Sequence, residues 1–194
     1  MRGVEQIPWL YDLGLWFAEL LGFIRWRRWL AEGATGRTLD LGTGTGRNLP
    51  WFSAAGPVVA IDPSRHGLRA ARARRPGAVL VRARAEALPF RDGAFDTVVS
   101  GLVFCSVDDP MAGLAEVERV LAPGGTLRMI EHVRSSSRLE TWWQDLIQPA
   151  WTWVAGGCRN NRETERTVVE AGFEIDPATR RASGTMRRFV ATPR

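Results

Sequence analysis

The sequence contains no lysine, and all 26 basic residues among its 194 are arginine. A pyridoxal Schiff base, the lysine of a GKS or GKT phosphate loop and the nucleotide-binding lysine of protein kinases all need an ammonium group that this chain does not possess. Those three classes of enzyme are therefore excluded. The net charge is +5 and the isoelectric point about 10.7, which describes a basic, solvated surface and does not by itself indicate nucleic-acid binding.

Cysteine and histidine are also scarce, with two of each. Cys105 and Cys158 are too few for a disulfide framework and neither lies in a CxxC motif, so we expect structural, reduced thiols in a cytoplasmic protein. Together with His66 and His132 they lack the spacing of zinc ligands, and we expect no bound metal. The apolar stretch at 7–24 contains two acidic residues and precedes no cleavage site, which argues against a signal peptide or a membrane span.

Length and composition predict a single domain, because 45% hydrophobic residues suffice to bury a core. We expect four segments within it: an N-terminal lid or cap helix at 1–33, a cofactor-binding core at 37–133, an acceptor-side insertion at 134–160, and a C-terminal helix with strands at 161–194. Apolar residues recur at helical spacing over 9–30, which is the basis for the cap helix.

Short runs rich in β-branched residues alternate with helix-forming runs through the middle of the chain. We expect strands at 38–42, 58–62, 78–83, 95–101, 126–133, 173–175 and 186–191, and helices at 47–54, 64–74, 111–121 and 163–171. This alternation predicts a Rossmann-like open α/β sheet of about seven mostly parallel strands with helices on both faces. The N-terminal helix and the tryptophan-rich insertion after the fifth strand are expected to cover the ligand site at the carboxyl ends of the strands.

A glycine-rich turn, residues 42–46, follows the first expected strand. Because glycine lacks a Cβ atom, backbone N–H groups there can approach a nucleotide-like ligand. The third glycine falls one place early for a nicotinamide dinucleotide fingerprint, and Asp40 would set a negative charge near a pyrophosphate. A carboxylate at that strand end suits a cationic ligand instead, such as the ammonium and sulfonium groups of S-adenosylmethionine. Asp62, which ends the next strand, can accept hydrogen bonds from two ribose hydroxyls.

Further motifs follow in order: AEALPF at 85–90, FDTV at 95–98 and RVLAPGG at 119–125. With the LDLGTGTG run they resemble the class I S-adenosylmethionine-dependent methyltransferases of the type 11 group, over about residues 37–133. The resemblance implies S-adenosyl-L-methionine as cofactor and S-adenosyl-L-homocysteine as product. It assigns to the cofactor Tyr11, Asp40, Gly42, Thr43, Gly44, Gly46, Asn48, Asp62, Pro63, Ser64, Ala85, Glu86, Ala87, Ser100, Gly101 and Leu102. Many relatives have aspartate where this chain has Arg84, so the acceptor for the adenine amino group stays open between a backbone carbonyl and Glu86.

A more specific resemblance begins with SGLVFCSVDDP at 100–110 and continues through EHV at 131–133 and WWQ at 142–144, to about residue 173. These runs look like the alkyl thiol S-methyltransferases of the microsomal methyltransferase-like family. The resemblance implies in-line methyl transfer to a small thiol, including hydrogen sulfide. Those relatives carry an N-terminal membrane anchor, whereas the shorter, acid-interrupted segment here suggests a surface-lying or lid helix.

His132, after the fifth strand, is the candidate catalytic residue. A free thiol has a pKa of about 8.5, so modest positive charge and one weak base suffice to activate it. His132 could take the thiol proton, or it could instead be a hydrogen-bonded histidine that positions Glu131 or the following loop.

Two uses remain open for the tryptophans, eight of which lie in two blocks outside the αβ core. Those at 142–153 could wall an apolar acceptor pocket, and those near the N-terminus, beside arginines, could lie on an anionic membrane. The second use favours a phosphatidylethanolamine or quinone methyltransferase as the alternative function. As partners we expect a small-molecule acceptor and no nucleic acid, since one aromatic residue interrupts the basic run at 65–91. Peripheral membrane contact through the N-terminal helix, and a monomer or a homodimer, stay open.

Overall fold

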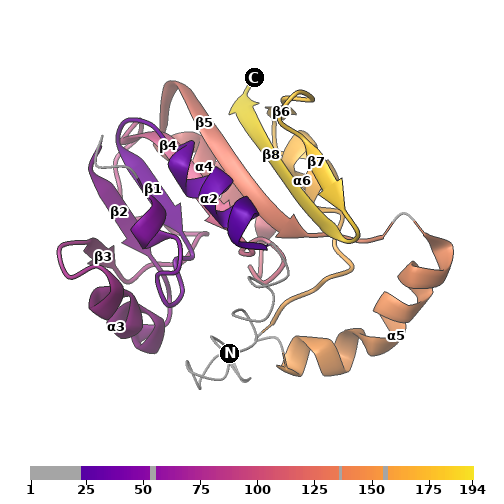
Figure 1. Ribbon diagram of the computed structural model, residues 1–194. Coiled ribbons are helices and arrows are strands. Elements are labelled where there is room, and N and C mark those ends of the chain that lie inside the picture. The colour runs from indigo at the N-terminus through magenta and orange to yellow at the C-terminus, as the bar shows by residue number, and fades with distance from the viewer. Residues whose placement is uncertain (1–22, 53–55, 136, 155–156) are drawn as a thin grey trace.

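The computed structural model describes residues 23–52, 56–135, 137–154 and 157–194. These residues contain an eight-stranded sheet with the order β3-β2-β1-β4-β5-β8-β6, in which β7 also pairs with β8 (Figure 1). The strands are β1 Thr38–Leu41, β2 Val58–Ile61, β3 Val79–Val81, β4 Phe95–Gly101, β5 Leu121–His132, β6 Phe173–Ile175, β7 Arg181–Ser183 and β8 Met186–Pro193.

The first five strands are parallel, and β8 enters antiparallel to β5. In register, Leu41 of β1 lies opposite Ile61 of β2 on one side and Ser100 of β4 on the other. Three strands therefore end side by side at one edge of the sheet. The predicted Rossmann-like, mostly parallel α/β sheet is confirmed.

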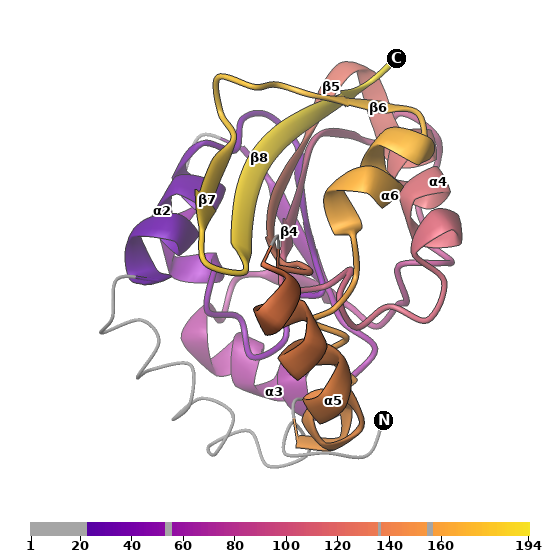
Figure 2. The same cartoon turned by 90° about the vertical axis from the view of Figure 1, so that its right-hand side faces the viewer.

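Helices cover both faces of the sheet. They are α2 Ile24–Glu32, the 3-10 turn η3 Leu49–Trp51, α3 Arg65–Arg74, α4 Pro110–Val120, α5 Arg138–Val154 and α6 Thr164–Glu170. Figure 2 shows α2 on one side of the sheet and α4 and α6 on the other. Ala71 of α3 packs in the same cluster as Leu30 of α2, so these two helices share a face.

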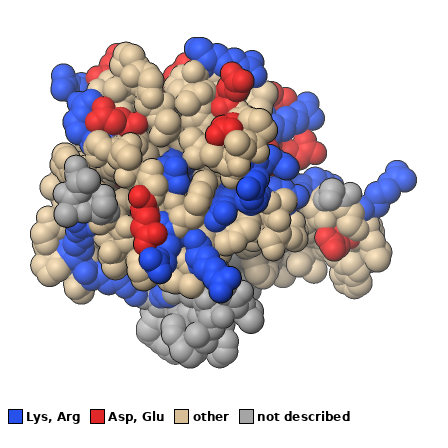
Figure 3. All heavy atoms as spheres, turned by 45° about the horizontal axis from the view of Figure 1, so that its top comes forward, with Lys and Arg blue, Asp and Glu red and all other residues tan. Residues whose placement is uncertain are grey.

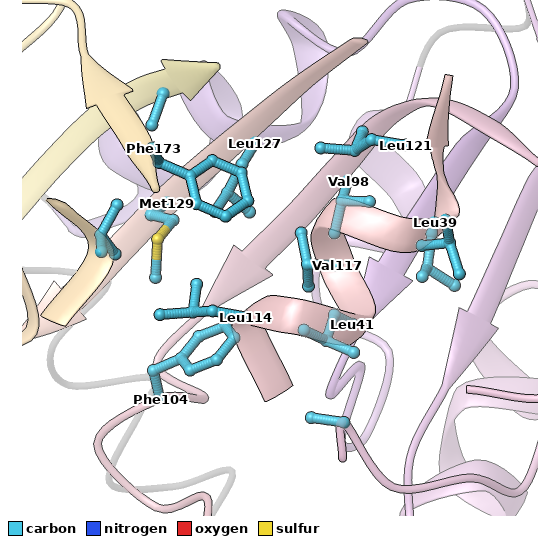
Figure 4. Packing of buried hydrophobic residues seen from close by; sticks show 14 of the residues in the cluster. Leu39, Leu41, Val98, Phe104, Leu114, Val117, Leu121, Leu127, Met129 and Phe173 are labelled. Carbon is cyan, nitrogen blue, oxygen red and sulfur yellow. The ribbon is translucent and has the colours of Figure 1, made fainter. Parts of the chain in front are cut away.

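The larger hydrophobic core lies between the sheet and α4 with α6. Figure 4 shows Leu39 and Leu41 of β1 beside Val98, with Leu114 and Val117 of α4 packed over them. These five side chains are at most 1% exposed, and each such burial is worth roughly 1.5–3 kcal/mol. The core therefore fixes the strand ends on which the site is built.

Two helices begin directly beyond strand ends because the sequence supplies N-caps there. The Ser64 hydroxyl accepts a hydrogen bond from Gly67 N (3.2 Å) at the start of α3. The Asp109 carboxylate accepts one from Ala112 N (3.0 Å) at the start of α4, where Pro110 occupies the first turn. Both caps set helix N-termini at the same edge as the ends of β2 and β4.

One expectation about the elements was wrong. In place of a helix over 47–54, the described residues form only η3, because Pro50 cannot donate a helical hydrogen bond; residues 53–55 lie outside the description. The insertion, for which no helix was predicted, forms the 17-residue helix α5 despite its internal Pro149. Of the cap helix expected over 9–30, α2 confirms the last part, and the residues before 23 lie outside the description.

Helix α5 projects from the body of the molecule (Figures 1 and 2). In the part of the chain that the structure describes, neither α5 nor any other helix has the length and apolar character to cross a bilayer.

Candidate cofactor site

A cleft of about 610 Å³ opens at the carboxyl ends of β1, β2 and β4, which is a volume typical of small-molecule sites. Eleven of the predicted cofactor residues line it: Gly42, Thr43, Gly44, Asn48, Asp62, Pro63, Ser64, Ala85, Glu86, Gly101 and Leu102. The structure thus brings together residues from four separate loops, as expected for an open α/β sheet.

The other predicted cofactor residues do not line the cleft, and Tyr11 lies outside the described residues. Gly46 (φ +81°) packs on α3, where an added Cβ would lie 2.7 Å from the Cα of Ala71, so this position needs glycine for packing. The Ser100 hydroxyl lies in the interior at 3.4 Å from Glu131 Oε1. Ala87 belongs to a tight turn and is exposed.

Asp40, at the end of β1, is fully buried directly beside this cleft. Its Oδ1 accepts a hydrogen bond from Asn48 Nδ2 (3.0 Å), and Asn48 Oδ1 accepts one from Arg27 Nη1 of α2 (2.6 Å). Its Oδ2 and the Thr43 hydroxyl have no partner in hydrogen-bond geometry among the described residues. Because an unsatisfied buried carboxylate oxygen is costly, this atom is suited to a ligand that donates a hydrogen bond.

Burial raises the pKa of Asp40 to about 6, against the opposing effects of nearby Thr43, Asn48 and Arg27. The Thr43 hydroxyl is close enough to favour the ionised carboxylate, although the two groups are not aligned as a hydrogen bond. A cationic ligand would favour the ionised form further. The site therefore prefers positive charge near the end of β1.

Asp62, at the end of β2, fixes the glycine loop. Its Oδ2 accepts a hydrogen bond from Gly44 N and its Oδ1 one from Ser64 N, both 2.8 Å. Burial raises the pKa of Asp62, and these two backbone hydrogen bonds oppose the rise. Each carboxylate oxygen can accept a further hydrogen bond, so Asp62 can hold the loop and still meet a ligand hydroxyl.

A third wall comes from the turn after β3. Glu86 Oε1 accepts hydrogen bonds from Asp108 N (3.2 Å) and Asp109 N (3.5 Å), which ties this turn to the loop before α4. Burial alone would raise the pKa of Glu86, but the hydrogen bonds it accepts, including that from Arg84, lower it below its usual value. Arg84 is directed to the carboxylates of Glu86 and Asp108.

Glu131 of β5 is a site residue whose role the sequence analysis did not establish. Its side chain is fully buried, and its oxygens accept hydrogen bonds from the backbone N–H groups of Val103 and Phe104 (2.9 Å each) and Cys105 (3.2 Å). Burial raises its pKa to about 7, and these three hydrogen bonds oppose the rise. They fix the turn after β4, where Leu102 adopts an uncommon positive φ of 62°. The signal for this role was an acid inside an otherwise apolar strand.

His132 is half-buried and is not among the described residues that line the cleft. Its side chain contacts the thiol of Cys158. A hydrogen bond from Cys105, followed by the effects of His132 and Trp151, lowers the pKa of Cys158 to about 5 despite burial. Proton abstraction by His132 stays a prediction, and the group that the structure places beside it is a thiol of the chain itself.

The tryptophan pocket expected in the insertion is wrong for Trp142 and Trp143. These side chains are 56% and 52% exposed and pack edge to face at 5.0 Å on the outer side of α5. The insertion instead reaches the cleft through Pro149, Thr152, Gly157 and Arg159. The reason is that α5 contacts the rest of the chain through polar side chains. Gln144 Nε2, for example, donates a hydrogen bond to Asn160 O (2.9 Å). This arrangement leaves Trp142 and Trp143 exposed on the other side of the helix.

Comparisons with known proteins agree with this geometry. Residues 39–129 match the model of the methyltransferase domain family. Over 153 residues the chain is 34% identical to the thiol S-methyltransferase TMT1B of Homo sapiens. The alignment covers 73% of this chain and 62% of that protein. Residues 39–129 therefore belong to the class I S-adenosylmethionine-dependent methyltransferase family.

Other relatives of this methyltransferase differ in what they share with it. It is 38% identical over 112 residues to the demethylmenaquinone methyltransferase of Renibacterium salmoninarum, covering 55% of this chain and 47% of that protein. An S-adenosylmethionine-dependent methyltransferase structure from Thermotoga maritima superimposes with a TM-score of 0.74 at 21% identity, covering 98% of both chains, and shows the shared fold. The methyltransferase spans about three fifths of the length of the first curated relatives.

The residues of the cleft fit S-adenosylmethionine, the cofactor of this family. Asp40 offers a buried acceptor for an ammonium group, and the backbone of residues 42–44 offers close approach. Asp62 offers acceptors for two adjacent hydroxyls. Ala85 and Glu86 lie on the wall where the adenine is expected.

Proposed function

We propose that this methyltransferase transfers the methyl group of S-adenosylmethionine to a small thiol, either an alkyl thiol or hydrogen sulfide. The extent of similarity supports this acceptor: the alignment with a thiol S-methyltransferase spans 153 residues, against 112 with a quinone methyltransferase. A shared cofactor core accounts for similarity to both. The additional aligned residues therefore favour the thiol.

When bound, S-adenosylmethionine would supply a sulfonium-activated methyl group for in-line transfer to a nucleophile, with S-adenosylhomocysteine as the leaving group. The chain's own contribution is to bind and to orient. Asp62 holds Gly44 in the middle of the glycine loop, Asp40 holds Asn48 just beyond it, and Glu131 fixes the turn at residues 103–105. Such positioning, with exclusion of water, supplies much of the acceleration in a bimolecular displacement.

The acceptor needs little activation. A free thiol has a pKa of about 8.5, so a substantial fraction is ionised near neutral pH once positive charge is close. Arg159 lines the cleft on the side of the insertion and supplies such a charge. In this proposal the thiol would lose its proton to water or to His132, and the thiolate would accept the methyl group of bound S-adenosylmethionine as the S–CH3 bond breaks and S-adenosylhomocysteine leaves.

The test is methyl transfer from labelled S-adenosylmethionine to three acceptors with the same alkyl chain, namely a thiol, an alcohol and an amine. The proposal predicts saturable methyl thioether formation and no product from the alcohol. Equal rates with the amine and the thiol, or no thiol product between pH 7 and 8.5, would contradict it. Arg159→Gln should raise the KM of the thiol more than it lowers kcat.

A second candidate acceptor is a membrane-embedded quinone, favoured by one specific observation. Helix α5 exposes Leu139, Trp142, Trp143, Leu146 and Ile147, each at least 42%, and its projecting end in Figure 3 is mostly uncharged. Such a face suits the interfacial region of a bilayer. Flotation with anionic vesicles tests this alternative: loss of binding in a Trp142→Ser, Trp143→Ser variant would support it, and absence of wild-type binding would reject it.

A further inference from the structure

The two cysteines of the chain meet behind the wall of the cleft. Cys105 lies in the loop between β4 and α4, and Cys158 lies in the segment that follows α5. Both side chains are buried, at 1% and 7% exposure, both are free thiols, and each affects the ionisation of the other. Nothing in the proposed methyl transfer uses either thiol.

The backbone already aligns the two segments. Arg159 N donates a hydrogen bond to Cys105 O (2.7 Å), and Arg162 Nη1 donates to the carbonyl oxygens of Phe104 and Val107 (2.6 Å each). Gln148 Nε2 of α5 donates to Cys158 O (3.0 Å). A bond between two cysteine sulfurs needs closely placed Cβ atoms, and these contacts provide that closeness with little backbone movement.

The two thiols differ in chemistry. Cys158 contacts His132, and its thiolate is favoured by Cys105, His132 and Trp151, which lower its pKa to about 5. The hydrogen bond to Cys158, burial and the negative charge of Glu131 raise the pKa of Cys105 well above its usual value. Oxidation of cysteine begins at the thiolate, and a neighbouring thiol resolves the product. Cys158, beside His132 and between the cleft-lining Gly157 and Arg159, is therefore the attacking thiol, and the more deeply buried Cys105 is the resolving one.

We propose that Cys105 and Cys158 form a peroxide-sensitive modification site, at which oxidation produces an intrachain disulfide. The Cys158 thiolate attacks hydrogen peroxide, so that an S–O bond forms, the O–O bond breaks, and the leaving hydroxide takes a proton from His132 and departs as water. The Cys105 thiol then attacks the sulfenic sulfur; the S–S bond forms, the S–O bond breaks, and a second water leaves with the Cys105 proton. Gly157 and Arg159, on either side of Cys158, line the cleft and give a small oxidant a route.

The disulfide would join two walls of the cleft. Val103, Ser106 and Val107 line it from the Cys105 loop, and Gly157 and Arg159 line it from the Cys158 segment. The cross-link fixes the distance between those walls on the side of the insertion. We expect oxidation to lower acceptor turnover while affinity for S-adenosylhomocysteine is retained; this activity effect, unlike the disulfide itself, rests on the proposed function.

The test treats the reduced, full-length protein with stoichiometric hydrogen peroxide and follows intact mass and free thiols. Because the chain has two cysteines, the expected result is a monomer lighter by two hydrogens with no free thiol, reversed by a dithiol reductant. With dimedone present, Cys105→Ala should accumulate a single sulfenic adduct on Cys158. Cys158→Ala should react with peroxide at least tenfold more slowly than Cys105→Ala. The His132→Asn variant should form the disulfide more slowly than the wild type.

Persistence of two free thiols in the wild type, disulfide-linked dimers as the main product, or equal reactivity of the two single-cysteine variants would overturn the proposal. These outcomes do not depend on methyl transfer, so failure of the thiol acceptor assignment leaves the readout intact. Disulfide formation without any change in turnover would reject the wall-fixing effect and retain the modification site.

Discussion

At the scale of single residues, two buried carboxylates organise the cofactor side and the turn after β4. Asp40 leaves one oxygen unsatisfied, whereas Glu131 uses both oxygens on three backbone N–H groups. Buried charges of this kind cost several kcal/mol unless they are paired. Asp40 can therefore accept a hydrogen bond from a cationic ligand, whereas Glu131 stabilises the backbone of the turn after β4.

Replacement of Asp40 by Asn should lower affinity for S-adenosylhomocysteine about ten- to a hundredfold, because a charge-assisted hydrogen bond to the ligand's ammonium is lost. The wild-type pKa of about 6 also gives a pH dependence. Wild-type affinity should be constant above pH 6 and fall below it, as protonation removes the charge, whereas the Asn48-bonded amide of Asp40→Asn should show no such fall. Isothermal titration calorimetry at pH 5, 6 and 8 checks both; a pH-dependent variant would contradict the assignment.

Replacement of Glu131 by Gln should destabilise the protein by roughly 1–3 kcal/mol at pH 5, because at least one backbone N–H of residues 103–105 loses its acceptor. The native pKa of about 7 lies above the ordinary value of 4.5 for a glutamate. Stability from such a raised pKa is present below pH 4.5 and lost as pH rises through 7. The deficit of the variant should therefore shrink from pH 5 to pH 8 in urea unfolding. A deficit that stays the same from pH 5 to pH 8 would mean that Glu131 is ionised throughout, and would contradict the raised pKa.

At the scale of elements, α5 is the least ordinary helix of the molecule. Its polar side chains face the chain: Gln144 accepts a hydrogen bond from Ser135 N (2.8 Å), and Asp145 pairs with Arg134 (2.7 Å). The large apolar side chains at 139, 142, 143, 146 and 147 are exposed, whereas Trp151 lies against Cys158. The helix is therefore docked through polar contacts, which is the reverse of an ordinary amphipathic helix on a core.

Gln144→Leu should release α5 locally, because Ser135 N and the carbonyl oxygens of Val133 and Asn160 lose their partner. We expect hydrogen exchange of residues 138–154 to accelerate at least tenfold while exchange in β1 and β4 is unchanged. Leu146→Ala, on the exposed face, is the matched control and should change little. Equal acceleration in both variants would contradict polar docking.

The elements differ in how far the sequence could predict them. Strands β1, β2 and β4 and helices α3 and α4 were predicted from the alternation of runs rich in β-branched residues with helix-forming runs. Helix α5 was not predicted, since Pro149 and clustered tryptophans hide its period. Of the residues predicted to bind the cofactor, eleven line the cleft. The contacts of Glu131 and of His132 with Cys158 join residues 26 to 28 positions apart, so they depend on tertiary packing that local patterns do not reveal.

At the scale of the whole molecule, charge is spread rather than concentrated. Figure 3 shows acidic side chains among the arginines, and pairs such as Arg119 with Glu116 (2.7 Å) and Arg37 with Asp96 (2.8 Å) neutralise part of the excess. Exposed pairs of this kind contribute little to stability. The features that bear on function lie instead at the carboxyl edge of the sheet. There the insertion lines the cleft with its residues 149–159 and exposes apolar side chains over 139–147 of α5.

The most direct test of the central claim is a competition in one reaction. It contains labelled S-adenosylmethionine, a short alkyl thiol and a demethylated quinone in anionic vesicles, with the Asp40→Asn variant as control. We predict label in the methyl thioether, saturable in thiol and strongly reduced in the variant, with no labelled quinone. Label in the quinone and none in the thioether would contradict the account and assign the acceptor to the membrane.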